Sequence, residues 1–92
     1  MADVIITLKI MPESPDVDLK KVQELALKKV IDFAEMENYK VEEEPMAFGL
    51  KALKILFVMD EAKGSPDPLE ADINTIKGVN SVETTDVRRA LG

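Results

Sequence analysis

Apolar and polar positions follow different patterns along the chain, and four stretches have the patterns of β-strands. Residues 4–11 are apolar or β-branched at nearly every position, which is typical of a central strand buried on both faces. Residues 50–59 are also rich in apolar side chains. Periodicity alone would allow a helix there, but the β-branched and aromatic centre favours a second central strand. Residues 39–44 and 79–87 carry more polar and charged side chains, as edge strands do.

Between the first two strands the spacing changes to that of an amphipathic helix, from Leu19 to about Met36. The apolar stripe consists of Leu19, Val22, Ala26, Val30 and Phe33, widened by Leu25. Four charged residues are left for solvent: Lys20, Lys21, Lys28 and Asp32. Two aspartates precede the helix, and either Asp16 or Asp18 can cap its first backbone N–H groups.

A second, shorter helix is predicted after a turn rich in small and polar residues. Asp67 is in the position of a capping residue, with Pro68 at the first helical position and Glu70 at the third. The helix is expected to continue through Ile76 and to end before Gly78, because glycine tolerates the left-handed conformation found after helices.

The resulting order is strand, helix, strand, strand, helix, strand. In a split βαβ arrangement the first and third strands pair in the middle of the sheet, which matches their apolar character. We therefore predict an α+β, ferredoxin-like βαββαβ sandwich, with four antiparallel strands and two helices on one face. The length of 92 residues fits one domain, residues 1–92. The fold alone names no function.

The composition removes much of the chemistry that enzymes use. Cysteine and histidine are absent, which excludes disulfides, thiolate metal sites and the commonest general base. With 18 acidic and 12 basic residues, the net charge of −6 disfavours direct binding to nucleic acid. The start lacks the features of a signal peptide, and no apolar run approaches the ~20 residues of a membrane span. A cytoplasmic protein without membrane contact is expected.

Acidic clusters are the remaining candidates for metal or acid–base chemistry. The glutamates at 42–44 could bind a hard cation, but alternate residues of a strand point to opposite faces, so no metal site is predicted. Asp60 and Glu61 are in a turn, and a helix cap explains Asp67 and Glu70; neither setting is expected to provide the buried carboxyl group that acid–base catalysis needs. No phosphate-binding glycine motif is present. We expect no catalytic residue and no cofactor.

One aromatic residue has an unusual position. Phe48 lies between the break at Pro45 and a glycine, Gly49, just before the second apolar strand begins. An aromatic side chain at the end of a rigid element is an efficient interface anchor. The alternative is that Phe48 caps the open end of the core. Aromatic residues are otherwise too few for the base stacking of RNA-recognition domains.

Four segments together resemble the archaeal elongation factor 1-beta family over essentially the whole chain. They are residues 4–12, residues 45–53 with the Phe-Gly-Leu-Lys motif, the acidic turn at 60–61, and residues 81–87. Members of this family are guanine-nucleotide exchange factors of the GTPase elongation factor 1-alpha. The resemblance implies a domain that accelerates GDP release by binding the nucleotide-free GTPase, without covalent chemistry.

The resemblance also assigns site residues. Phe48 matches the aromatic that in relatives inserts into a pocket of the GTPase's nucleotide domain, and Gly49, Leu50 and Lys51 match the rest of the motif. Eukaryotic relatives have a lysine beside the C-terminus that reaches the magnesium and phosphate region; this chain has none there.

The C-terminal segment offers two arginines in place of that lysine. Arg88 or Arg89 takes its role, or both belong to a solvated tail. We expect Phe48 and this segment to dock together, at one end of the sheet, on elongation factor 1-alpha, with the chain monomeric when free. The alternative is a ferredoxin-like small-molecule-sensing or dimerisation domain that uses a sheet face or edge. An RNA-binding domain, a third reading, would lose affinity steeply with salt.

Overall fold

A computed structural model describes residues 2–89 of the chain. Strand β1 spans Asp3–Pro12, helix α1 Leu19–Ala34, β2 Tyr39–Pro45, β3 Lys51–Asp60, helix α2 Asp67–Ile73 and β4 Val79–Arg89. Two short 3₁₀ turns, η1 at Ala47–Gly49 and η2 at Glu61–Lys63, flank β3. The segment 90–92, part of the C-terminal ending considered above, lies outside the described residues.

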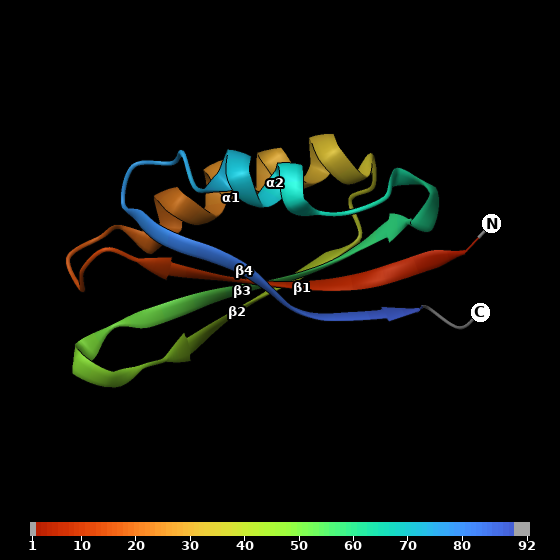
Figure 1. The fold of residues 1–92 in the computed structure, drawn as a ribbon. Helices are drawn as coiled ribbons and strands as arrows, with labels where there is room; N and C mark the ends of the chain where they lie inside the picture. The colour runs from red at the N-terminus through yellow and green to blue at the C-terminus, as the bar shows by residue number, and fades with distance from the viewer. Residues whose placement is uncertain (1, 90–92) are drawn as a thin grey trace.

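The four strands form one antiparallel sheet in the order β2-β3-β1-β4. Both helices lie on one face of this sheet, and within residues 2–89 the other face carries none (Figure 1). The two apolar strands, β1 and β3, are the central pair, and the polar strands β2 and β4 are the edges. The predicted ferredoxin-like α+β sandwich is confirmed.

The prediction that β1 is buried on both faces is wrong. Its side chains alternate: Ile6, Leu8 and Ile10 are buried, whereas Ile5 and Thr7 are half-buried. The buried set faces the helices, and the other set lies on the sheet face that no helix covers. Dense apolar sequence therefore marks a central strand here, although the sheet has only one covered face.

The core lies between the sheet and the two helices. Helix α1 contributes four residues at helical spacing, and the strands contribute their helix-facing side chains. The largest fully buried side chain is Phe57 of β3. Phe33 packs against the core while remaining half-buried, and Leu25 is 38% exposed, so the predicted apolar stripe is narrower than expected.

The ends of α1 are set by two residues. Asp18, not Asp16, caps the helix: its Oδ1 accepts hydrogen bonds from the backbone N–H groups of Lys20 at 3.1 Å and Lys21 at 3.4 Å. The helix ends at Ala34 instead of Met36 because Glu35 adopts a left-handed conformation with φ of 58°.

The expected boundaries of α2 are wrong at both ends. Asp67 lies inside the helix, and its backbone N–H donates to the Ser65 hydroxyl at 3.1 Å, so Asp67 is not the cap. The helix ends at Ile73 instead of Ile76, because tighter turns follow, in which the N–H of Ile76 donates to the Ile73 carbonyl. Gly78 then takes φ of 97° and leads into β4.

The molecule is elongated, with extents of 42 × 21 × 19 Å. The β2–β3 hairpin turn and the start of α1 lie at one end, on the left of Figure 1. The start of β1 and the end of β4 lie at the opposite end, on the right of Figure 1. These two ends contain the two groups of residues that the sequence singled out.

Candidate functional site

The first candidate group is at the tip of the β2–β3 hairpin. Antiparallel pairing brings Pro45 opposite Lys51, and the N–H of Met46 donates to the Leu50 carbonyl at 2.8 Å. These contacts close a narrow turn with Phe48 at its apex. The side chain of Phe48 is 93% exposed, so it does not cap the core.

The backbone of this turn is strained. Phe48 has φ of 63° and ψ of 29°, and Gly49 follows with φ of 75°. A bulky residue in the left-handed region is unfavourable because its Cβ approaches the backbone, whereas glycine accepts this region freely. A Cβ at Gly49 would meet no atom within 4 Å, so its dihedral angles alone favour glycine there. The turn therefore holds an apolar ring away from the protein at a conformational cost.

The rest of the motif continues into β3. Leu50 is half-buried and ends the 3₁₀ turn, and Lys51 begins the strand with an exposed side chain. Gly49 and Lys51 border a hollow of about 370 Å³ that extends to the β1–α1 loop at Pro15 and Val17. The four motif residues thus run from the tip of the hairpin into the start of β3.

The second candidate group ends β4. Arg88 and Arg89 pair with Ile5 and Val4 of β1, so both belong to an ordered strand and not to a loose tail. Their side chains are 77% and 67% exposed. As neighbours on a strand, the two point to opposite faces of the sheet.

Each arginine already has an acidic partner. The Nε of Arg88 lies 2.7 Å from an oxygen of Asp86, and an Nη of Arg89 lies 2.8 Å from an oxygen of Glu61. Arg89 therefore links the end of β4 to the acidic turn that follows β3. Exposed ion pairs of this kind stabilise a protein by less than about 1 kcal/mol, so another anion can displace them.

The structure separates the two groups, and the expectation that they share one end of the sheet is wrong. Phe48 precedes the first residue of β3, whereas the arginines lie near its last residue, Asp60. A ten-residue strand is about 30 Å long. The antiparallel register explains the error, because β4 runs back along β1 and ends beside its start.

Ion pairs cover part of the uncovered sheet face. Lys54 Nζ lies 2.7 Å from an oxygen of Glu44, and Lys40 Nζ lies 3.3 Å from an oxygen of Glu42. Contact with Lys54, through hydrogen bonding first and charge second, holds the pKa of Glu44 below its ordinary value. The same contact raises the pKa of Lys54. Glu42 and Glu44 therefore offset the positive charges of Lys40 and Lys54.

Residues 2–89 contain neither a metal-binding cluster nor a helix suited to a membrane. Within this range no three acidic residues are grouped as ligands for a metal ion. Neither described helix combines the length and apolar character that crossing a membrane requires.

Comparison with known proteins supplies the family. A family model described as the EF-1 guanine nucleotide exchange domain matches residues 5–90. Elongation factor 1-beta of Methanothermobacter thermautotrophicus is 42% identical over 91 residues, covering 99% of this chain and 100% of that protein. The protein of the same name from Methanobrevibacter smithii is 47% identical over 94 residues, with the same shares. That of Staphylothermus marinus is 38% identical over 90 residues, covering 97% of this chain and 98% of its own.

A solved structure shares the fold. BlrP1 BLUF superposes on this chain with a TM-score of 0.58 at 16% identity, and the match covers 100% of this chain and 57% of that one. At this identity the likeness concerns the fold alone. The family match and the end-to-end relatives, in contrast, confirm the resemblance that the Phe-Gly-Leu-Lys motif indicated. The chain therefore belongs to the elongation factor 1-beta family and carries its guanine nucleotide exchange domain.

Proposed function

We propose that this protein is a translation elongation factor that accelerates GDP release from elongation factor 1-alpha by binding the nucleotide-free GTPase more tightly than the loaded one. The proposed unit is the whole chain, residues 1–92, acting as a monomer in the cytoplasm, where it would allow GTP to reload the GTPase. No bond is made or broken by the factor, and it needs no cofactor. The family supports the exchange role.

The observation that carries this proposal is the exposure of Phe48. A bulky apolar ring that is 93% exposed, on a turn held by positive φ angles, stabilises nothing in the free protein. Strained and exposed features of this kind are typical of binding sites, where the geometry needed by the complex is already present. Phe48 with Gly49, Leu50 and Lys51 is the proposed primary contact.

Differential binding is sufficient for this activity. Nucleotide and factor weaken each other's binding by the same factor, because the two equilibria are linked. An acceleration of ~1,000-fold needs a barrier lower by about 4 kcal/mol. Burial of one aromatic ring contributes about 1.5–3 kcal/mol, and polar contacts at the rest of the interface can supply the remainder.

Arg88 and Arg89 are the proposed second contact. Because they lie about 30 Å from Phe48, a partner that touches both groups must extend along the length of the sheet. An arginine at this end is suited to a phosphate or carboxylate of the GTPase, since its planar group donates two parallel hydrogen bonds. Which of the two takes the place of the lysine of eukaryotic relatives is decided by single substitutions.

The decisive experiment measures release of fluorescent GDP from purified elongation factor 1-alpha. The wild-type chain should accelerate release, and Phe48→Ala should slow it while the fold survives. Arg88→Ala and Arg89→Ala, assayed in parallel, separate the second contact from the first. Equal affinity of the wild-type chain for the GDP-bound and the empty GTPase would refute the proposal.

A further inference from the structure

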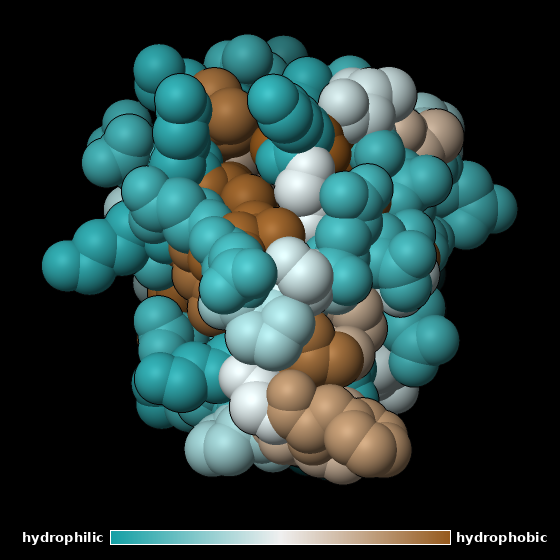
Figure 2. Space-filling model, turned by 90° about the vertical axis from the view of Figure 1, so that its left-hand side faces the viewer, coloured by the Kyte–Doolittle hydropathy of each residue, from teal (hydrophilic) through white to brown (hydrophobic). Residues whose placement is uncertain are grey.

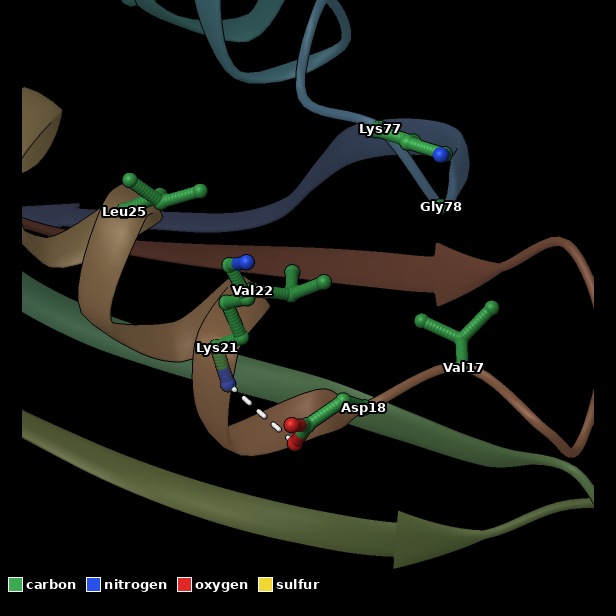
Figure 3. Close-up of a pocket in the computed structure, with 7 residues that line it drawn as sticks. All are labelled: Val17, Asp18, Lys21, Val22, Leu25, Lys77 and Gly78. Carbon is green, nitrogen blue, oxygen red and sulfur yellow. Dashed lines mark hydrogen bonds between the residues drawn. The ribbon is translucent and has the colours of Figure 1, made fainter.

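An apolar groove lies between the start of α1 and the loop that leads into β4. Its volume is about 330 Å³, and its residues come from three segments, the β1–α1 loop, α1 and the loop before β4 (Figure 3). Val17, Val22 and Leu25 give it an apolar lining, and Leu25 is one of the few large apolar side chains that are exposed. Figure 2, which faces this end of the molecule, shows apolar surface open between hydrophilic side chains.

The groove is built into the fold. Gly78 forms one wall with φ of 97°, and a Cβ there would lie 2.9 Å from a methyl group of Val17. The N–H of Glu13 donates to the Gly78 carbonyl at 2.9 Å, which fixes this loop against the end of β1. The wall of the groove is therefore held in place by packing and by backbone hydrogen bonding.

Two lysines and one aspartate give the lining of this groove a net positive charge. Lys21 and Lys77 line it, and within residues 2–89 neither makes an ion pair. The one acidic lining residue, Asp18, uses its Oδ1 to cap α1. In a chain with net charge −6, two lysines without ion-pair partners beside an apolar groove complement an apolar side chain flanked by carboxylates.

The sequence of α1 adds an independent observation. The first turn contains Lys20 and Lys21 and no acidic residue, although the positive end of the helix dipole favours acidic side chains there. Glutamate at the position of Lys21 would complete a capping box with Asp18. These lysines are therefore unfavourable for the helix itself.

We propose that this groove, defined by Val17, Lys21, Leu25, Lys77 and Gly78, is a second docking site for the GTPase that Phe48 contacts. This inference rests on the proposed function. Its occupant is an apolar side chain of the GTPase with carboxylates beside it. The groove is continuous with the Phe48 end, because the hollow next to it is lined by Val17 and Asp18 on one side and by Gly49 and Lys51 on the other.

The test is the GDP-release assay with the concentration of the chain varied. Lys21→Glu and Lys77→Glu should each raise the half-saturating concentration about tenfold, because an attraction becomes a repulsion, and should leave the maximal rate unchanged. Leu25→Ser keeps the charge and removes an apolar contact, and it should raise the half-saturating concentration about threefold or more. The matched control is Lys28→Glu, an exposed residue of α1 outside the groove, with an expected change below about twofold.

Loss of folding is separable from loss of docking. Lys21→Glu should raise the thermal midpoint of the free chain, because it improves the start of α1. If the three groove variants behave like Lys28→Glu while Phe48→Ala slows exchange, the groove inference is overturned and the proposed function stands. If the wild-type chain does not accelerate release, both fail. If sedimentation shows that the free wild-type chain is a dimer and that Leu25→Ser is a monomer, a second copy of the chain occupies the groove, and the inference is overturned.

Discussion

Replacing Phe48 by alanine tests whether an exposed ring on a strained turn serves a partner. In the free protein the ring contacts almost nothing, since 93% of its surface is exposed. Alanine keeps a Cβ, so the positive φ remains as unfavourable as before. We therefore expect the free energy of unfolding to change by less than about 0.5 kcal/mol, which corresponds to less than about 4 °C in the thermal midpoint.

The effect on exchange should be much larger. Full burial of a phenylalanine side chain in a partner contributes about 1.5–3 kcal/mol. Since about 1.4 kcal/mol is a factor of ten in an equilibrium constant, Phe48→Ala should weaken binding to the empty GTPase about 10- to 150-fold. Phe48→Leu keeps most of the apolar surface and should retain most of the activity.

Glycine at the same position makes the test sharper. Phe48→Gly relieves the left-handed strain and should stabilise the free protein by about 1 kcal/mol while it reduces exchange as strongly as alanine does. The assays are fluorescent-GDP release and thermal unfolding, with the same three variants. Full exchange activity of Phe48→Ala, or a midpoint that falls by far more than a few degrees, would refute the reasoning.

Three other substitutions test the geometry. Gly49→Ala should destabilise the fold by about 1 kcal/mol, from conformation alone, as measured by urea unfolding. Gly78→Ala should lower the free energy of unfolding by more, about 2–3 kcal/mol, because the new Cβ would lie 2.9 Å from Val17 in addition to the strain of the positive φ. An equal loss of stability in both variants would contradict this. Lys54 holds the pKa of Glu44 low, so this pair contributes stability above the ordinary carboxyl pKa, and the contribution is lost as pH falls through the lower folded value. Lys54→Met should therefore reduce the loss of stability between about pH 7 and pH 3, and an unchanged pH profile would contradict the assignment.

The topology could be predicted because it depends on the spacing of apolar residues. Buried positions of α1 recur every four residues at Val22, Ala26, Val30 and Ala34, and the most apolar strands became the central pair. The helix boundaries were less predictable, because a single hydrogen bond can decide where a helix begins. The sequence could not show that Ser65 would accept the N–H of Asp67 and move the start of α2.

The sequence could name the residues of the candidate site but not their arrangement in space. The motif identified Phe48, but a phenylalanine between a proline and a glycine can fold onto the core or away from it, and its φ of 63° decides this. The distance from Phe48 to Arg88 depends on strand register, which no short motif contains. The apolar groove was missed altogether, although the absence of acidic residues from the first turn of α1 was a visible signal.

The charges of α1 oppose its dipole at both ends, and this makes a final test possible. Lys21 lies in the first turn and Asp32 in the last, and each placement costs about 0.3–1 kcal/mol. Lys21→Glu and Asp32→Lys should therefore both raise the thermal midpoint, by about 2–8 °C. Only Lys21→Glu should weaken docking, because Asp32 lies outside the groove. If Lys21 lowers the stability of its own helix but strengthens binding to a partner, its role is in the complex. If Lys21→Glu instead lowers the thermal midpoint, the lysine stabilises the fold and this explanation fails.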